Sequence, residues 1–154
     1  FFVIDLNLYW LIYILSGKNK IGWVFIENMV KGNRIGNSII GIGINVNQTH
    51  FEGLPHASSL LLKTGEKIEI SDLLEGILKF LQTYLDKLSC NEGAWLLEKY
   101  ELSLFLKGKV SSFVDDVEQF EGVIMGVTEN GLLRVQKPSG EIFNYSHGAI
   151  EMVY

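Results

Sequence analysis

The residues best suited to chemistry lie in one alternating run, residues 39–48, Ile-Ile-Gly-Ile-Gly-Ile-Asn-Val-Asn-Gln. On an extended strand, successive side chains point to opposite faces, so the run has an apolar face and a face of glycines and amides. The second face consists of Gly41, Gly43, Asn45 and Asn47. Glycine within a strand often marks a close approach of backbone or ligand. The apolar face therefore predicts core packing, and the glycine face predicts the floor of a binding site.

A second strand-like run, residues 21–30, precedes this one, and Gly32-Asn33 between them favours a tight hairpin turn. A turn at these two residues fixes the cross-strand register. The predicted pairs are Lys31 with Arg34, Val24 with Gly41, Gly22 with Gly43, and Lys20 with Asn45. Cross-strand partners share a face, so this register sends Trp23 to the core side.

Lys20 is the candidate cation of this glycine face. A lysine is a point charge that holds a phosphate or polarises a carboxylate. On spacing alone, Lys20 is equally well interpreted as a solvated lysine at a strand edge. His50 and His56 lie in a loop and are more typical of surface residues than of metal ligands. No residue is assigned as a metal ligand.

The composition favours an ordinary globular chain of 154 residues, 47% hydrophobic and 20% charged, with a net charge of −5. Lysine and arginine are scattered, which argues against a nucleic-acid partner. Cys90 is the single cysteine, which fits a reducing compartment such as the cytoplasm. The apolar residues 1–15 are too short to span a bilayer, which takes about 20 residues, so no membrane role is expected.

Further along, a 3.6-residue period predicts a helix that starts at Ser71 as N-cap and continues to Leu88. A second helix is expected over residues 91–102. After Lys107-Gly108, short strands alternate with turns, which is typical of a small β-barrel. The expected domains are therefore residues 1–107 and residues 108–154.

Several of these segments together resemble biotin–protein ligases, and the resemblance covers most of residues 17–154. The segments are Lys20-Ile21-Gly22, Ile26-Glu27-Asn28, Gly32-Asn33-Arg34, residues 38–48, Ala57-Ser58-Ser59-Leu60, residues 120–127 and Gly131-Leu132-Leu133. The resemblance implies an α+β fold with a mixed sheet packed on helices. The sheet and its helices correspond to half of a class II synthetase-like catalytic domain, and an SH3-like barrel follows them.

The resemblance also implies an enzyme that joins biotin and ATP into biotinyl-adenylate. A lysine of a biotin carboxyl carrier domain then attacks the adenylate. In this scheme Lys20 is catalytic and contacts biotin and the acyl-phosphate. Gly22, Gly41 and Gly43 bind biotin, and Asn45 lies near the nucleotide phosphates. Biotin, ATP and magnesium are the implied cofactors, and the carrier domain is the implied partner.

Three departures from the family pattern accompany the resemblance. The Gly-Arg-Gly-Arg-type loop that closes over the adenylate does not occur in this sequence. Where the family has Lys-Trp-Pro-Asn-Asp, this chain has residues 9–13, with Ile12 and Tyr13 in place of the Asn and Asp. Trp23 stands where a second glycine usually follows Gly22. We therefore expect a truncated ligase without ligase activity on its own.

Two other functions fit the sequence. One is a noncatalytic binding module derived from a ligase, which the missing nucleotide loop favours. The other is a lipoyl or octanoyl transferase of the related superfamily, although the C-terminal barrel and the Gly-Ile-Asn strand favour biotin. Because a partial domain would expose sheet edges and apolar surface, we also expect a homo-oligomer paired through sheet edges.

Overall fold

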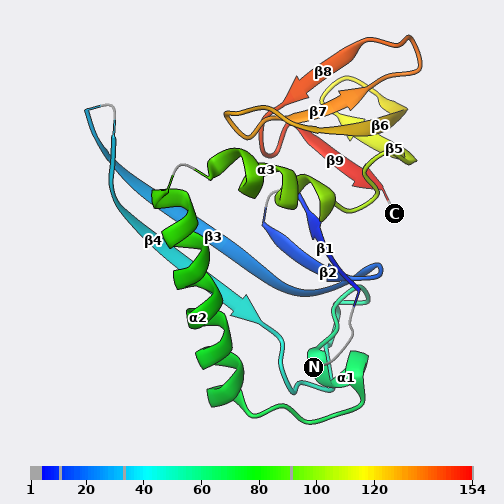
Figure 1. Ribbon diagram of the computed structural model, residues 1–154. Coiled ribbons are helices and arrows are strands. Elements are labelled where there is room, and N and C mark those ends of the chain that lie inside the picture. Colours follow the sequence, from blue (N-terminus) through cyan, green and yellow to red (C-terminus); the bar gives the residue numbers. More distant parts are fainter. Residues whose placement is uncertain (1–4, 11, 33, 91, 154) are drawn as a thin grey trace. The chain divides into compact units, whose positions relative to one another are not determined.

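The computed structural model describes residues 5–10, 12–32, 34–90 and 92–153, which fall into two compact units that divide after Ser89 (Figure 1). The first unit contains four strands followed by two helices. These are β1 (Leu6–Tyr9), β2 (Tyr13–Ser16), β3 (Asn19–Lys31), β4 (Arg34–Ile44), α1 (Leu60–Thr64) and α2 (Ile70–Ser89). The strands form one sheet in the order β1-β2-β3-β4, and each neighbouring pair is antiparallel. An isolated parallel bridge joins Lys20 to Ala57, so the pairing in this unit is mixed.

The long β3–β4 hairpin confirms the predicted pair of Lys31 with Arg34, and Asn33 of the predicted turn lies outside the described residues. The register further along the hairpin differs from the prediction. Val30 pairs with Ile35 but Met29 pairs with Asn37, which leaves Gly36 as an extra residue on β4. Such a β-bulge moves every later pair by one residue and therefore exchanges the two faces of the strand.

The bulge makes three predicted pairs wrong. Val24 pairs with Ile42 and Gly22 pairs with Ile44, instead of with the glycines of β4. The residues across from the glycines are aromatic, since Gly43 pairs with Trp23 and Gly41 with Phe25. Lys20 does not pair with Asn45 either, because the backbone NH of Asn45 donates to the carbonyl of Ile21. Trp23 therefore lies on the glycine face and not on the core face.

A second bulge restores Lys20 to the glycine face. Along the β2–β3 ladder, Tyr13 pairs with Trp23 and Leu15 pairs with Lys20, and Ile21 is the residue left over. Since Tyr13 and Leu15 share one face of β2, their partners Trp23 and Lys20 share the same face of β3.

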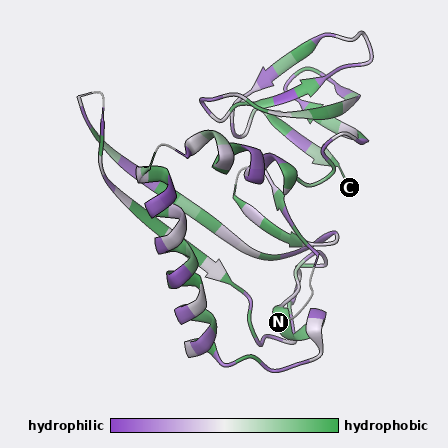
Figure 2. Cartoon of the chain, in the orientation of Figure 1, coloured by the Kyte–Doolittle hydropathy of each residue, from purple (hydrophilic) through white to green (hydrophobic). Residues whose placement is uncertain are grey.

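The opposite face of β3–β4 is turned toward α2 across an open apolar groove that is lined by residues of both (Figure 1). The core of this unit is small: Ile21, Val46 and Leu60 are buried, and Ile14, Ile44, Ile68 and Leu73 pack against them. Helix α2 confirms the predicted period and begins at Ile70, one residue before the predicted cap. None of its described residues is buried, and hydrophobic and hydrophilic bands alternate along the helix in Figure 2. Leu78 is 55% exposed and Phe80 is 62% exposed, so this layer leaves much apolar surface in water.

The second unit contains one helix and five strands. These are α3 (Gly93–Leu102), β5 (Val110–Asp115), β6 (Gln119–Val127), β7 (Leu133–Gln136), β8 (Ile142–Tyr145) and β9 (Ile150–Val153). The strands pair antiparallel in the order β8-β7-β6-β5-β9. The buried residues of this sheet include Phe113, Ile124 and Val135. The α+β fold predicted from the sequence is confirmed.

The division between the units comes earlier than the predicted boundary at Lys107-Gly108. The reason is that α3 and the turn after it are bonded to the strands. Glu101 of α3 accepts a hydrogen bond from the backbone NH of Val127, and the NH of Gly108 donates to the carbonyl of Ile124. No helix in the described part of the chain is long and apolar enough to cross a membrane.

Candidate functional site

The glycine face of the first unit brings an aromatic ring directly onto the two glycines of β4. A Cβ atom placed on Gly43 would collide with the indole nitrogen and two ring carbons of Trp23. A Cβ atom placed on Gly41 would lie 3.6 Å from another carbon of the same ring. The indole of Trp23 therefore lies on the backbone of both glycines, and their role as the floor of a binding site stays a prediction.

Lys20 lies beside this surface, with its ammonium nitrogen 3.6 Å from the centre of the Tyr13 ring. The ring face carries partial negative charge and attracts the cation. Partial burial lowers the pKa of Lys20 because the charged form loses hydration. The backbone holds the position firmly: the NH of Lys20 donates to the carbonyl of His56, and its carbonyl accepts from Ser58.

Asn45 and Asn47 follow the end of β4, and their side chains form hydrogen bonds with the backbone of the segment that comes after it. The side-chain NH₂ of Asn45 donates to the carbonyl of Ser58 at 2.9 Å. Asn47 uses both ends of its amide on one backbone position, donating to the carbonyl of Ile68 at 2.8 Å and accepting from its NH at 3.0 Å. These amides support the loops around the site, and the contact of Asn45 with a nucleotide stays a prediction.

Ser59 completes this loop network. It is fully buried, and its hydroxyl donates to the carbonyl of Gln48 at 2.6 Å. The same oxygen accepts from the NH of Leu62, which makes Ser59 the N-cap of α1. The segment of residues 57–60 therefore connects the end of the glycine strand to the first helix.

The structure thus brings Lys20, Gly41 and Gly43 to one face. Gly22 lies on the other face, where a Cβ atom would be 2.7 Å from the carbonyl of Gly43 and 3.5 Å from the side chain of Ile14. The biotin contacts assigned to these residues stay predictions. Sequence reasoning missed Tyr13 as the ring beneath Lys20. The only available signal was its place in the segment that aligns with the Asn and Asp of the family pattern.

Within the described residues, the face of Lys20, Gly41 and Gly43 offers no cluster of acidic side chains for a magnesium ion. Mg²⁺ prefers oxygen ligands in octahedral geometry, usually one or two carboxylates together with substrate phosphates. The described residues contain no group of three or more His, Cys, Asp or Glu side chains that could hold a metal ion.

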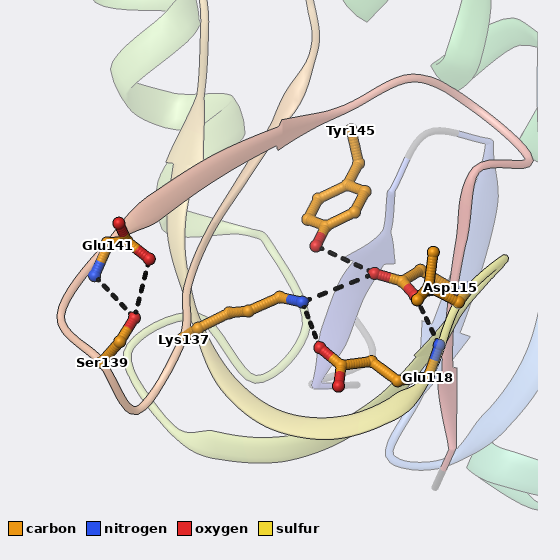
Figure 3. Close-up of polar contacts among 7 residues, drawn as sticks. Asp115, Glu118, Lys137, Ser139, Glu141 and Tyr145 are labelled. Atoms are coloured by element: carbon orange, nitrogen blue, oxygen red, sulfur yellow. Dashed lines mark hydrogen bonds and ion pairs between the residues drawn. The ribbon is translucent and has the colours of Figure 1, made fainter.

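The second unit has a charged cluster of its own (Figure 3). The ammonium of Lys137 lies 2.7 Å from Glu118 and 3.6 Å from Asp115, and the Tyr145 hydroxyl donates to Asp115 at 3.3 Å. Hydrogen bonds from the NH groups of Glu118 and Val117 lower the pKa of Asp115, and the bond to Glu118 raises the pKa of Lys137. These charges are paired among themselves, so we interpret the cluster as a structural tie between the β5–β6 turn and β7–β8.

Comparison with known proteins gives structural matches only. No protein-family model and no curated protein matches the sequence. The fold matches a mutant biotin protein ligase from Aquifex aeolicus in complex with biotin, with a TM-score of 0.76, 24% identity, and coverage of 97% of this chain and 62% of that one. The chain has the fold of a biotin protein ligase.

Two further structures of biotin protein ligases show the same fold. The Aquifex aeolicus enzyme in complex with biotin and ATP gives a TM-score of 0.75 at 22% identity, covering 96% of this chain and 62% of that one. The Leishmania major enzyme in complex with biotinyl-5-AMP gives 0.50 at 20% identity, covering 92% and 56%. This chain therefore spans less than two thirds of the length of these biotin protein ligases.

Proposed function

We propose that this chain is a biotin–protein ligase-type protein that binds biotin on the face formed by Lys20, Gly41 and Gly43. The observation that supports it most is the placement of a cation on the same face as Gly41 and Gly43, within a fold shared with biotin protein ligases. A glycine floor lets a flat ring approach the backbone closely. A neighbouring ammonium neutralises the carboxylate at the end of the ligand's acyl chain.

In the proposed reaction, the biotin carboxylate attacks the α-phosphorus of ATP and pyrophosphate leaves. The amine of a carrier-domain lysine then attacks the acyl carbon, AMP leaves, and an amide is formed. Lys20 would contribute by attracting the carboxylate and by stabilising negative charge on the acyl-phosphate oxygens. Its partial burial strengthens this attraction, because there is less water to screen the charge. The proposed partner is a biotin carboxyl carrier domain, and the proposed location is the cytoplasm.

Titration calorimetry of the whole chain with biotin tests this proposal. We expect saturable binding of biotin. Since the sequence contains no Gly-Arg-Gly-Arg run to close over an adenylate, we expect no biotinylation of a carrier domain when ATP is added to this chain alone. Absence of biotin binding would refute the proposal, and robust turnover would refute the expected inactivity.

A noncatalytic binding module is the second candidate. Its support is the loop network, in which the amide of Asn45, the residue assigned to the nucleotide, donates to the carbonyl of Ser58. A module of this kind would bind biotin but would neither bind ATP nor release pyrophosphate. Calorimetry with ATP in the presence of saturating biotin distinguishes the two candidates, because only the ligase would give a second binding event.

We also propose that the chain forms a homo-oligomer through the edge of its first sheet. In the described ladders β4 pairs with β3 alone, which leaves one edge of an 11-residue strand unpaired. Ile35 is 62% exposed and Ile39 is 59% exposed on this strand. Unprotected apolar edges favour pairing with another chain, and lysine on an edge opposes it.

Light scattering at micromolar concentration checks this prediction. We expect the mass of a dimer or larger assembly for the wild-type chain and a monomer for Ile39→Lys. Lys31→Gln, a change at the hairpin tip, should leave the assembly intact. A monomeric wild-type chain would contradict the prediction.

A further inference from the structure

Trp23 lies in the space that a ligand on the glycine face would need. Its indole covers Gly43 so closely that a Cβ atom there would collide with three atoms of the ring, and it extends over Gly41 as well. The ring is nevertheless 43% exposed, so it is held from one side by the glycines and is open to water on the other. Its cross-strand neighbour in β2 is Tyr13, the ring that carries the Lys20 ammonium.

The neighbouring aromatic residue on the same face does not lie on the glycines in this way. Phe25 pairs with Gly41, yet the atoms nearest to a Cβ placed on Gly41 are two carbons of the Trp23 ring and the carbonyl oxygen of Phe25. Trp23 therefore covers both glycines. A half-exposed ring can move at modest energetic cost, because little apolar surface has to leave a packed core.

We propose that Trp23 is a specificity-determining residue of the proposed site. In the conformation observed, its indole shields the glycine floor, and a ligand with a fused bicyclic ring reaches the floor only after the indole swings away. The energy of moving the ring lowers the affinity for such ligands, whereas a thin unbranched acyl chain needs less of this space. This inference rests on the proposed binding of biotin at Lys20, Gly41 and Gly43.

Calorimetry with biotin on three matched chains tests the effect on binding. Trp23→Ala removes the ring that covers the floor, and Phe25→Ala removes an aromatic ring two residues away on the same face. We expect Trp23→Ala to bind biotin at least roughly tenfold more tightly than the wild-type chain, which corresponds to about 1.4 kcal/mol. Phe25→Ala should bind as the wild-type chain does. Equal or weaker binding by Trp23→Ala would overturn the inference, while binding by the wild-type chain would still support the proposed function.

A second measurement tests the contact itself and requires no ligand. Gly43→Ala is introduced into the wild-type chain and into Trp23→Ala, and thermal unfolding is followed by circular dichroism. We expect the midpoint to fall clearly with the tryptophan present and to change little without it, because the new methyl group meets the indole only in the first background. Equal shifts in both backgrounds would overturn the inference. If neither the wild-type chain nor Trp23→Ala binds biotin, the proposed function and this inference fail together.

Discussion

Replacing Lys20 by glutamine is expected to weaken biotin binding by roughly 10- to 100-fold. Hydrogen bonds to charged groups contribute about 1.5–3 kcal/mol, and each factor of ten in affinity corresponds to about 1.4 kcal/mol. Glutamine keeps a polar side chain of similar length but removes the positive charge that would neutralise the ligand's carboxylate. The backbone bonds of this position, to His56 and Ser58, do not involve the side chain and should persist.

Lys18→Gln is the matched control for this experiment. Lys18 is exposed in the turn between β2 and β3, so its loss changes the net charge of the chain equally. Calorimetry with biotin should show a loss for Lys20→Gln only. The wild-type affinity should also fall as the pH rises through the lowered pKa of Lys20, since the ammonium then loses its proton. Equal losses in the two variants would indicate a general electrostatic effect and would contradict the role of Lys20.

Replacing Glu101 by alanine is expected to destabilise the second unit by about 1–4 kcal/mol. One oxygen of this carboxylate accepts from the backbone NH of Val127 at 2.9 Å, and the other lies 2.7 Å from the ammonium of Lys107. Val127 is buried, so its NH would be left without a partner, which costs about 1–3 kcal/mol. The partly exposed pair with Lys107 adds up to about 1 kcal/mol.

Urea unfolding of Glu101→Ala, Glu101→Gln and Glu98→Gln measures this effect. Glutamine retains an acceptor for Val127 and should cost less than alanine. Glu98→Gln is the control, because Glu98 is exposed on the same helix. Ordinary surface substitutions cost less than about 0.5 kcal/mol. A loss of that size for Glu101→Ala would contradict the stabilising role of its contacts with Val127 and Lys107.

The same residue makes the stability of the second unit depend on pH. The hydrogen bond from Lys107, followed by the one from Val127, lowers the pKa of Glu101 below its ordinary value of 4.5. A carboxyl whose pKa is lower in the folded state stabilises the fold above the unfolded-state pKa and ceases to do so as the pH falls through the folded-state pKa. The stability difference between the wild-type chain and Glu101→Gln should therefore shrink below about pH 4.5. An unchanged difference between pH 7 and strongly acidic pH would contradict this prediction.

Periodicity and turn chemistry predicted most of the secondary structure correctly. The pair of Lys31 with Arg34, the long amphipathic helix and the short strands of the second unit are confirmed because each depends on residues close in sequence. The register of the hairpin was not predictable in the same way. Gly36 is the residue that the β-bulge leaves unpaired. Glycine within a strand is a signal for a bulge, but Gly41 and Gly43 carry the same signal without one, so the sequence does not say which glycine forms it.

The candidate site shows the same division between local and distant information. The glycine face followed from alternation. Lys20 was assigned to it through a pair with Asn45 that does not form, and two bulges set the final arrangement. The partners of Asn45 and Asn47 are backbone groups 13 and 21 residues away. Their structural role therefore depends on how the later loop folds back, which no local pattern of the strand reveals.

The extra residue at Gly36 determines which side chains of β3 and β4 share a face. Whether the stretch of β4 between the turn and the glycines contains an odd or an even number of residues decides whether the indole of Trp23 or the bare backbone of Gly22 faces Gly43. A single insertion or deletion in that stretch would interchange the two surfaces of the hairpin while leaving its composition nearly unchanged. Among hairpins of this kind, ligand preference would then vary with strand length as well as with the identity of the residues that meet the ligand.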